Sequence, residues 1–188
     1  DSRDHFVRTV LIYGSSLPEI ALQDRIKEKE IQQKIANGSF ATALKLCQEW
    51  QPIVHKNFKI YERILIRGTN LEGLKTRLFQ QIATASALID PPTQRQALSS
   101  IKDVASLKET VTALAKIFLK AGQTDRFFEI IDLMPANYPS QRDDLLIEQG
   151  KQSNDPNTLK KVVESASTPL TKYLIVKSAA ELFLKDGQ

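Results

Sequence analysis

A 34-residue stretch occurs twice in this chain of 188 residues. Residues 90–123 and 155–188 align without a gap at an offset of 65, and 11 of the 34 aligned positions are identical. Ordinary residue frequencies would give roughly two identities. Six of the matches fall in one nine-residue motif, A-x-x-F-L-K-x-G-Q. Self-similarity at a fixed offset is typical of proteins built from stacked structural repeats.

Turn signals divide the 65-residue period into two shorter parts. Asp90 and Asp155 are each followed by proline, a pair that favours the start of a helix because Asp caps free N–H groups and proline fits the first helical position. Gly122 and Gly187 favour a helix end. These four turns are spaced 32, 33 and 32 residues apart. The sequence therefore predicts an all-α fold, an α-solenoid of antiparallel helix hairpins with a repeat of about 32–33 residues.

Apolar periodicity predicts which side of each helix is buried. A stripe of apolar residues at helical spacing runs over residues 71–89 and ends at Ile89. The capping box Ser106-x-x-Glu109 predicts a helix start at Ser106. Phe118 and Phe127 are expected in the core. In the last helix, the residues expected to point inward are Tyr173, Val176, Ala180 and Phe183.

Three regions are expected along the chain. Residues 1–15 form an N-terminal arm or a short helix, residues 16–70 form an N-terminal helical hairpin region, and residues 71–188 form the repeats. Residues 53–67 favour a helix, although their β-branched residues also suit a strand. The second copy of the motif stops where the first copy enters its next helix, so the repeats are expected to continue beyond residue 188.

The repeats resemble the tetratricopeptide-like (TPR-like) class of helical repeats. The pattern A-x-x-F-x-x-x-G at Ala115–Gly122, followed by apolar Phe127, carries the resemblance, as do its second copy at 180–187 and G-x-F-x-x-A at 38–43. The chain departs from the family where Phe127 and its equivalent Leu159 are large, and it lacks the Trp-Leu-Gly start. The resemblance implies a superhelix with a concave face that binds another protein. It provides no peptide-clamp residues that can be transferred to this chain.

Composition is that of an ordinary soluble protein, with 41% apolar and 26% charged residues. No apolar run reaches the roughly 18 residues of a membrane span. We therefore expect no membrane span and a soluble protein, with a cytoplasmic location favoured. Cys47 is the single cysteine and lies between apolar neighbours, which favours a buried thiol.

Reactive constellations are scarce in the sequence. His5 and His55 lie fifty residues apart and lack zinc-site spacing, and the common phosphate-binding and nucleophile motifs are absent. The pair Asp143-Asp144 is interpreted as a first-turn complement to a helix dipole. We expect no cofactor, no metal and no enzymatic activity.

One localised charge feature remains, the basic stripe. Lys56, Lys59, Arg63 and Arg67 are spaced three, four and four residues apart, and Lys75 and Arg77 extend the set. The stripe could bind an acidic protein segment or a phosphate backbone, or be only a solvated helix face. Repeats without reactive groups favour a scaffold or adaptor that binds another protein or peptide. Nucleic-acid binding through the stripe is the alternative, and an enzyme or regulatory domain with an unrecognised site is the third hypothesis.

Overall fold

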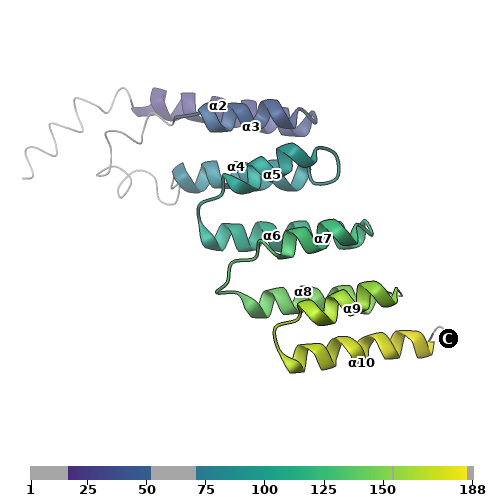
Figure 1. Ribbon diagram of the computed structural model, residues 1–188. Helices are drawn as coiled ribbons and strands as arrows, with labels where there is room; N and C mark the ends of the chain where they lie inside the picture. Colours follow the sequence, from purple (N-terminus) through teal and green to yellow (C-terminus); the bar gives the residue numbers. More distant parts are fainter. Residues whose placement is uncertain (1–16, 52–70, 154, 186–188) are drawn as a thin grey trace, which may run out of the picture. The chain divides into compact units, whose positions relative to one another are not determined.

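The fold is all-α over the residues that the structure describes. The computed structural model describes residues 17–51, 71–153 and 155–185, and within these ranges it contains helices, turns and loops but no strand (Figure 1). The helices are α2 (Leu17–Ala36), α3 (Phe40–Glu49), α4 (Leu71–Ala85), α5 (Pro91–Ser99), α6 (Val104–Lys120), α7 (Thr124–Ile131), α8 (Pro139–Gln152), α9 (Pro156–Ser165) and α10 (Pro169–Lys185). The prediction of an all-α fold is confirmed for these residues.

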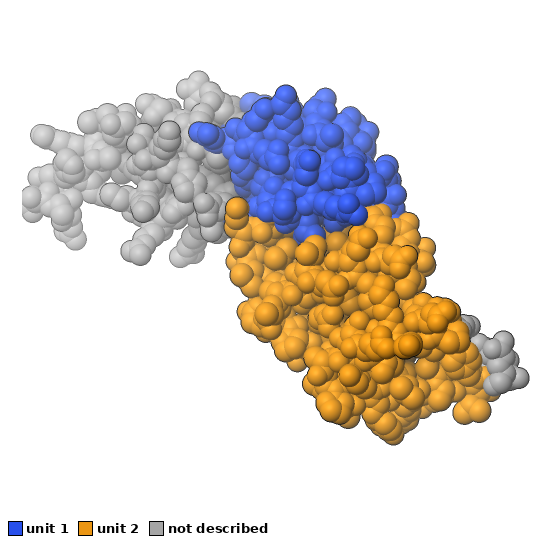
Figure 2. Space-filling model, in the orientation of Figure 1, with its two compact units in different colours: residues 1–100 blue, residues 101–188 orange. Residues whose placement is uncertain are grey.

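The chain divides into two compact units, residues 1–100 and 101–188 (Figure 2). In the first unit α2 packs on α3, α4 packs on α5, and α3 and α2 both contact α4. In the second unit α6 packs on α7, α8 packs on α9, and α10 packs on both α8 and α9. The boundary predicted at residue 70 lies inside the first unit.

Two Asp-Pro pairs start their helices as predicted. Asp90 caps α5 by accepting hydrogen bonds from the Thr93 backbone N–H at 3.1 Å and from the Thr93 hydroxyl at 2.6 Å. Asp155 caps α9 in the same way, with both bonds from Thr158 at 2.7 Å. Each aspartate satisfies a backbone donor that the first turn of a helix leaves without an intrahelical partner. The repeated sequence thus produces the same local structure twice.

The predicted start of α6 at Ser106 is wrong by two to three residues. Asp103 is the N-cap, and its Oδ2 accepts from the Ser106 backbone N–H at 2.7 Å, so Ser106 lies inside the first turn. Asp and Ser are both good N-caps, and the capping-box pattern selected the later one. In the second copy Thr168 caps α10, accepting from the Thr171 backbone N–H at 3.1 Å. Helices α6 and α10 therefore keep the 65-residue offset at both ends.

Gly38 and Gly122 end helices by adopting left-handed conformations, with φ of 72° and 66°. After Gly122, the Gln123 N–H bonds to the Phe118 carbonyl at 2.9 Å and the Gly122 N–H to the Leu119 carbonyl at 3.1 Å. This pair of bonds is a Schellman motif, in which residues past the helix end satisfy its last carbonyls. Gly38 closes α2 with the same pattern. Glycine is favoured at both positions because it adopts positive φ without steric cost.

Each unit has its own apolar core. In the first unit the fully or almost fully buried side chains are Ile31, Ala43, Leu44, Cys47, Leu78, Ile82 and Ala83. In the second they include Val111, Leu114, Ala115, Phe118, Phe127, Ile131, Leu146, Val162 and Ile175. The core positions predicted for Phe118 and Phe127 are confirmed. The stripe predicted to end at Ile89 does not extend that far, because α4 ends at Ala85 and Ile89 is 74% exposed.

The buried face of α10 differs from the predicted one. Tyr173 and Val176 were expected to point inward, but they are 61% and 55% exposed, and Ala180 is also exposed. Thr171, Ile175 and Ala179 are buried instead, on the side where α10 packs on α8 and α9. The physical reason is that apolar residues occur on most sides of this helix, so periodicity alone does not select the side that meets the partner helices.

Cys47 is fully buried in α3, as predicted. Burial raises the pKa of its thiol to about 12, and the charge of Lys75 only partly opposes this shift. Because the thiolate is the reactive form, only about one thiol in 10⁴ is ionised at pH 8. We expect 5,5′-dithiobis-(2-nitrobenzoate) to label Cys47 at least about 100-fold more slowly in the native chain than in guanidinium, measured by absorbance. Equal rates would show that Cys47 is accessible in solution.

Candidate functional site

A groove between α2 and α4 is the candidate functional site of the first unit. It has a volume of about 440 Å³ and is lined by Gln32, Ile35, Ala36, Gln81, Thr84 and Ala85. Each helix contributes three residues at positions i, i+3 and i+4, in the patterns Q-x-x-I-A and Q-x-x-T-A. Residues at this spacing lie on one face of a helix. The two helices therefore present matching ridges to the same groove.

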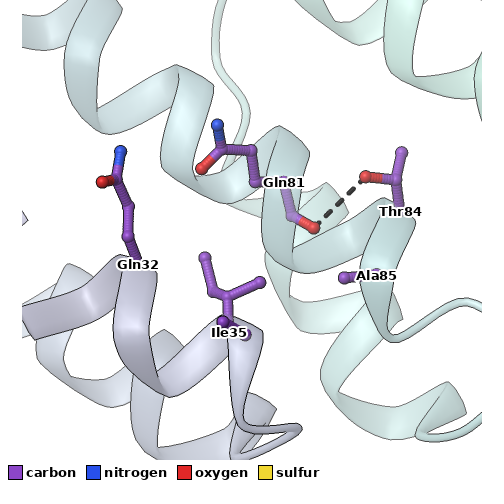
Figure 3. Close-up of a pocket in the computed structure, with 6 residues that line it drawn as sticks. Gln32, Ile35, Gln81, Thr84 and Ala85 are labelled. Carbon is purple, nitrogen blue, oxygen red and sulfur yellow. Dashed lines mark hydrogen bonds between the residues drawn. The ribbon is translucent and has the colours of Figure 1, made fainter. Parts of the chain in front are cut away.

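The groove combines an apolar floor with polar groups. Figure 3 shows the Gln32 and Gln81 side chains extending in the same direction, with Ile35 and Ala85 nearby. The Thr84 hydroxyl donates to the Gln80 carbonyl at 2.9 Å and also lies 3.2 Å from that of Gln81, so its donor is used within α4. None of the described residues that line the groove is charged. It therefore suits a neutral, partly apolar ligand.

The two glutamine carboxamides have unused hydrogen-bonding capacity. The Gln32 amide donates one long bond of 3.4 Å to Glu28, and the Gln81 side chain has no partner among the described residues. A carboxamide offers one acceptor oxygen and two N–H donors, which match the donor and acceptor of a peptide bond. These amides can therefore bind the backbone groups of a polypeptide. The apolar floor can contact small apolar side chains of the same polypeptide.

Two polar contacts hold the helices around this groove. The Trp50 indole N–H at the end of α3 donates to Asp24 Oδ1 of α2 at 3.0 Å, and both side chains are buried. The Lys75 ammonium of α4 donates to the carbonyls of Gln48 and Trp50 at 3.1 and 2.9 Å. A cation at the carbonyl end of a helix is favourable for the helix dipole. These bonds tie the end of α3 to both helices that form the groove.

The predicted basic stripe is only partly within the described structure. Lys56, Lys59, Arg63 and Arg67 lie outside the described residues. Lys75 binds the carbonyls at the end of α3, and the Arg77 side chain is exposed. The role of the basic stripe in binding a partner therefore stays a prediction.

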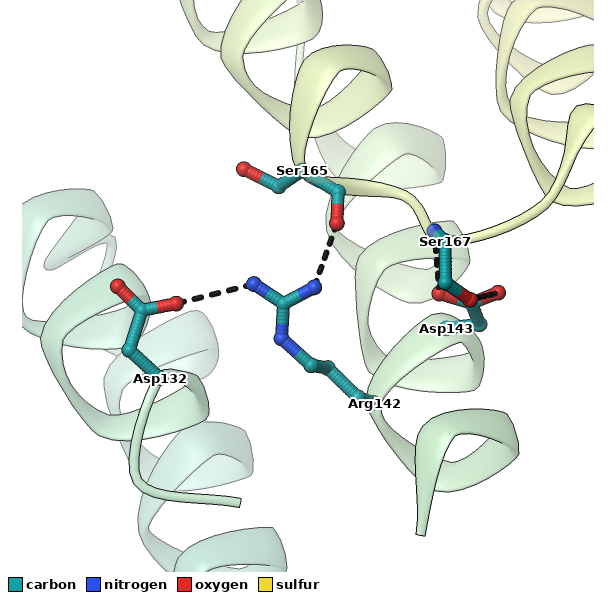
Figure 4. A network of polar contacts seen from close by, with 5 residues as sticks. All are labelled: Asp132, Arg142, Asp143, Ser165 and Ser167. Carbon is teal, nitrogen blue, oxygen red and sulfur yellow. Dashed lines mark hydrogen bonds and ion pairs between the residues drawn. The ribbon is translucent and has the colours of Figure 1, made fainter. Parts of the chain in front are cut away.

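Polar groups in the second unit form a separate network around Asp143 of α8 (Figure 4). The Asp143 carboxylate accepts from the Ser167 backbone N–H at 3.1 Å, from the Ser167 hydroxyl at 2.5 Å and from the Thr171 hydroxyl at 2.7 Å. Burial alone would raise the pKa of Asp143, but these hydrogen bonds and the nearby charge of Arg142 together bring it below its usual value of 3.8. The carboxylate is thus held in its ionised form.

The neighbouring Arg142 joins three parts of this unit. Its guanidinium donates to the Ser165 carbonyl at the end of α9 and to Asp132 Oδ1 after α7, the latter at 2.9 Å. Asp143 was interpreted from sequence as a first-turn complement to the helix dipole. This interpretation is wrong, because Asp143 lies beyond the first turn of α8 and binds the connection between α9 and α10. The network fixes that connection.

The described part of the Asp143 network consists of aspartate, arginine, serine and threonine side chains, without a histidine. A serine hydroxyl bonded to a carboxylate needs a base such as histidine to take its proton. His5 and His55 lie outside the described residues, so the zinc-site and enzyme expectations stay untested. Among the described residues no group of three His, Cys, Asp or Glu side chains could hold a metal ion. No described helix is both long and apolar enough to cross a membrane.

The comparisons with known proteins identify no relative. The chain matches no protein-family model, no curated protein sequence and no solved structure. The TPR-like resemblance is therefore carried by the motifs of this chain alone.

The groove was not predicted from the sequence. A search for the same i, i+3, i+4 pattern in different helices would have detected Q-x-x-I-A and Q-x-x-T-A, which recur at an offset of 49. That pattern becomes informative only once α2 and α4 are known to be in contact.

Proposed function

We propose that this chain is a non-enzymatic scaffold or adaptor that binds another protein through helical repeats. Its architecture would be a TPR-like α-solenoid of antiparallel helix hairpins, with the 32–33-residue spacing of the turns. The observation that carries the proposal is the groove between α2 and α4, whose matching ridges combine two glutamine carboxamides with an apolar floor. This chemistry suits an extended segment of a partner protein.

The expected ligand of the groove is a short, uncharged peptide with small apolar side chains. Its backbone would bond to the carboxamides of Gln32 and Gln81, and its side chains would contact Ile35, Ala36 and Ala85. Because the groove is open, the affinity should be modest. We expect a dissociation constant in the micromolar range, which corresponds to a binding free energy of about −8 kcal/mol. Such peptides can be selected from a random phage-displayed library against the full chain.

Ala85→Arg should weaken binding of a selected peptide at least about 10-fold, or about 1.4 kcal/mol, because the long side chain fills the groove. Fluorescence anisotropy with the labelled peptide measures this change. Gln33→Arg is the matched control, since Gln33 is exposed on α2 but does not line the groove. If every selected peptide binds Ala85→Arg as tightly as the natural chain, the groove is not the binding site.

The same assay separates protein binding from nucleic-acid binding. Single-stranded RNA and duplex DNA are titrated into the full chain at two salt concentrations. Phosphate contacts make affinity fall steeply with salt, whereas a neutral peptide groove is almost insensitive to it. Two results together would favour the basic-stripe hypothesis over the proposal. Nucleic-acid binding would be salt-sensitive and lost in Lys59→Glu/Arg63→Glu, and no selected peptide would lose affinity in Ala85→Arg.

A further inference from the structure

Helices α6 and α10 occupy equivalent positions in the two repeat copies and have the same local structure. Both span 17 residues, and their bounds differ by the 65-residue offset of the repeat. Each begins with an N-cap side chain that accepts from the backbone N–H three residues later, Asp103 in α6 and Thr168 in α10. Position by position, α10 is therefore the counterpart of α6.

In α6 the face formed by the repeated motif is completely covered. Val111, Ala115 and Phe118 are all 0% exposed. Helix α7 packs on α6, and its own buried side chains are Phe127, Phe128, Ile130 and Ile131. The Arg126 guanidinium of α7 lies over the Phe118 ring, 4.2 Å from its centroid, so α7 meets α6 at the motif itself.

In α10 the equivalent residues are less covered, and Phe183, the counterpart of Phe118, is half-buried. Val176 corresponds to Val111 and is 55% exposed, Leu184 corresponds to Leu119 and is 78% exposed, and Ala180 is also exposed. Together with α9, α10 forms an apolar groove of about 300 Å³, lined by Leu159, Val163, Ile175, Val176, Ala179, Ala180 and Phe183. Exposed apolar side chains that gather beside such a groove are typical of interaction surfaces.

We propose that this surface, the α10 face (Val176, Ala180, Phe183 and Leu184), binds an amphipathic helix with the apolar pattern of α7. The pattern is R-F-F-x-I-I, in which two adjacent aromatic residues follow an arginine and two isoleucines follow one residue later. The aromatic and isoleucine side chains fill the groove between α9 and α10. The arginine stacks over the Phe183 ring as Arg126 does over Phe118, a cation–π contact.

The charges beside the α10 face are compatible with such a helix. Exposed Lys172 and Lys177 flank the face, and acidic residues stand on either side of the R-F-F-x-I-I pattern, at Asp125 in α7 and at Asp132 directly after it. The surface lies in the second unit and uses none of the residues of the α2–α4 groove. The proposal therefore goes beyond the proposed function, and either one can fail alone.

The test extends the full chain after Gln188 with a copy of residues 124–135, TDRFFEIIDLMP, so that the new segment follows Gly-Gln as α7 follows Gly122-Gln123. A tethered helix binds at a high effective concentration, which compensates for its short length. We expect the thermal midpoint to rise by several degrees and amide exchange in the added segment to slow at least about 10-fold. The control extension, TDRSSESSDLMP, should produce neither change.

Val176→Asp should abolish both effects of the added helix, because it places a charge at the centre of the α10 face. Val176 is more than half exposed in the natural chain, so the variant should fold, as circular dichroism will verify. Lys151→Asp is the control, since Lys151 is exposed in the same unit outside the face. The proposal is overturned if the two extensions behave alike or if Val176→Asp leaves the stabilisation intact.

Sedimentation equilibrium of the natural chain tests a competing occupant. If the chain forms a dimer that Val176→Asp dissociates, a second copy covers the α10 face and the proposal of an α7-like helix is wrong. A monomer over the accessible concentration range is the expected result.

Discussion

Asp143→Ala is expected to lower the free energy of unfolding of the second unit by about 2–4 kcal/mol. The substitution removes the acceptor of three hydrogen bonds, those from the Ser167 backbone and hydroxyl and from the Thr171 hydroxyl. Thr171 is buried and would lose this acceptor, leaving the Thr168 hydroxyl at 2.8 Å as the remaining partner of its own hydroxyl, while the Ser167 backbone N–H would lose its acceptor. Leaving a buried polar group unsatisfied costs more than an average hydrogen bond contributes.

Chemical denaturation of the full chain, followed by far-ultraviolet circular dichroism, measures this loss. Asp144→Ala is the matched control, because Asp144 is the exposed neighbour of Asp143 on the same helix. It should change the free energy of unfolding by less than about 0.5 kcal/mol. If the two variants are equally stable, the network around Asp143 contributes no net stability.

The same carboxylate predicts how stability depends on pH. The pKa of Asp143 in the folded chain lies below its usual value of 3.8, because the hydrogen bonds and Arg142 outweigh the opposing effect of burial. The unfolded chain therefore binds a proton more readily than the folded chain at this position. The resulting stability is fully present above about pH 4 and is lost as the pH falls through the folded pKa.

Asp143→Asn keeps the shape of the side chain but removes the titrating group. Its free energy of unfolding should therefore depend less steeply on pH below about pH 4 than that of the natural chain. Hydrogen bonds also lower the pKa values of the N-cap residues Asp103 and Asp155, so a shallower acid-sensitive component remains in the variant. Identical profiles for the two proteins would contradict the role of Asp143.

Gly150→Val is expected to destabilise the second unit by about 3 kcal/mol, and Gly150→Ala by about 1 kcal/mol. A Cβ atom at Gly150 of α8 would lie 2.9 Å from Ile175 Cγ2 of α10, closer than real Cβ atoms approach their neighbours. Ile175 is fully buried and branched at Cβ, so its side chain cannot easily move away. This steric cost exceeds the gain of about 1 kcal/mol that alanine has over glycine in a helix.

A double-mutant cycle shows whether the close approach of α8 and α10 is the cause. Ile175→Ala removes the clashing methyl group, so in that background Gly150→Ala should no longer destabilise and should approach its favourable helix propensity. Lys151→Ala, at the exposed position next to Gly150, is the control for propensity alone. If Gly150→Ala costs as much in the Ile175→Ala background as in the natural chain, the contact with Ile175 is excluded as its origin.

Local signals explain which parts of the fold the sequence predicted well. Asp90, Gly122 and Asp155 act through hydrogen bonds or backbone conformation within a few residues, so their effect is visible in a short stretch of sequence. Cys47 was placed correctly because its neighbours are apolar on the side that α3 buries. The wrong helix start at Ser106 also came from a local signal, because two suitable N-cap residues, Asp103 and Ser106, lie three positions apart.

Features that depend on two helices could not be predicted in this way. Val176 and Ile175 are equally apolar neighbours in α10, and only the position of α8 and α9 decides that Ile175 is the buried one. Asp143 is bound by a connection 24 residues away in the sequence. Gln32 and Gln81 line one groove only because α2 and α4 are in contact. Spatial proximity of this kind leaves no periodic signal in the chain.

The hydrogen bond between Trp50 and Asp24 provides a spectroscopic reporter for the first unit. Trp50 is the single tryptophan of the chain and is almost fully buried, so its emission maximum will shift to the red when water reaches the indole. Circular dichroism, in contrast, reports the helices of both units. Asp143→Ala therefore also measures folding cooperativity: if Trp50 emission keeps its original midpoint while the dichroism changes in two steps, residues 1–100 and 101–188 unfold independently.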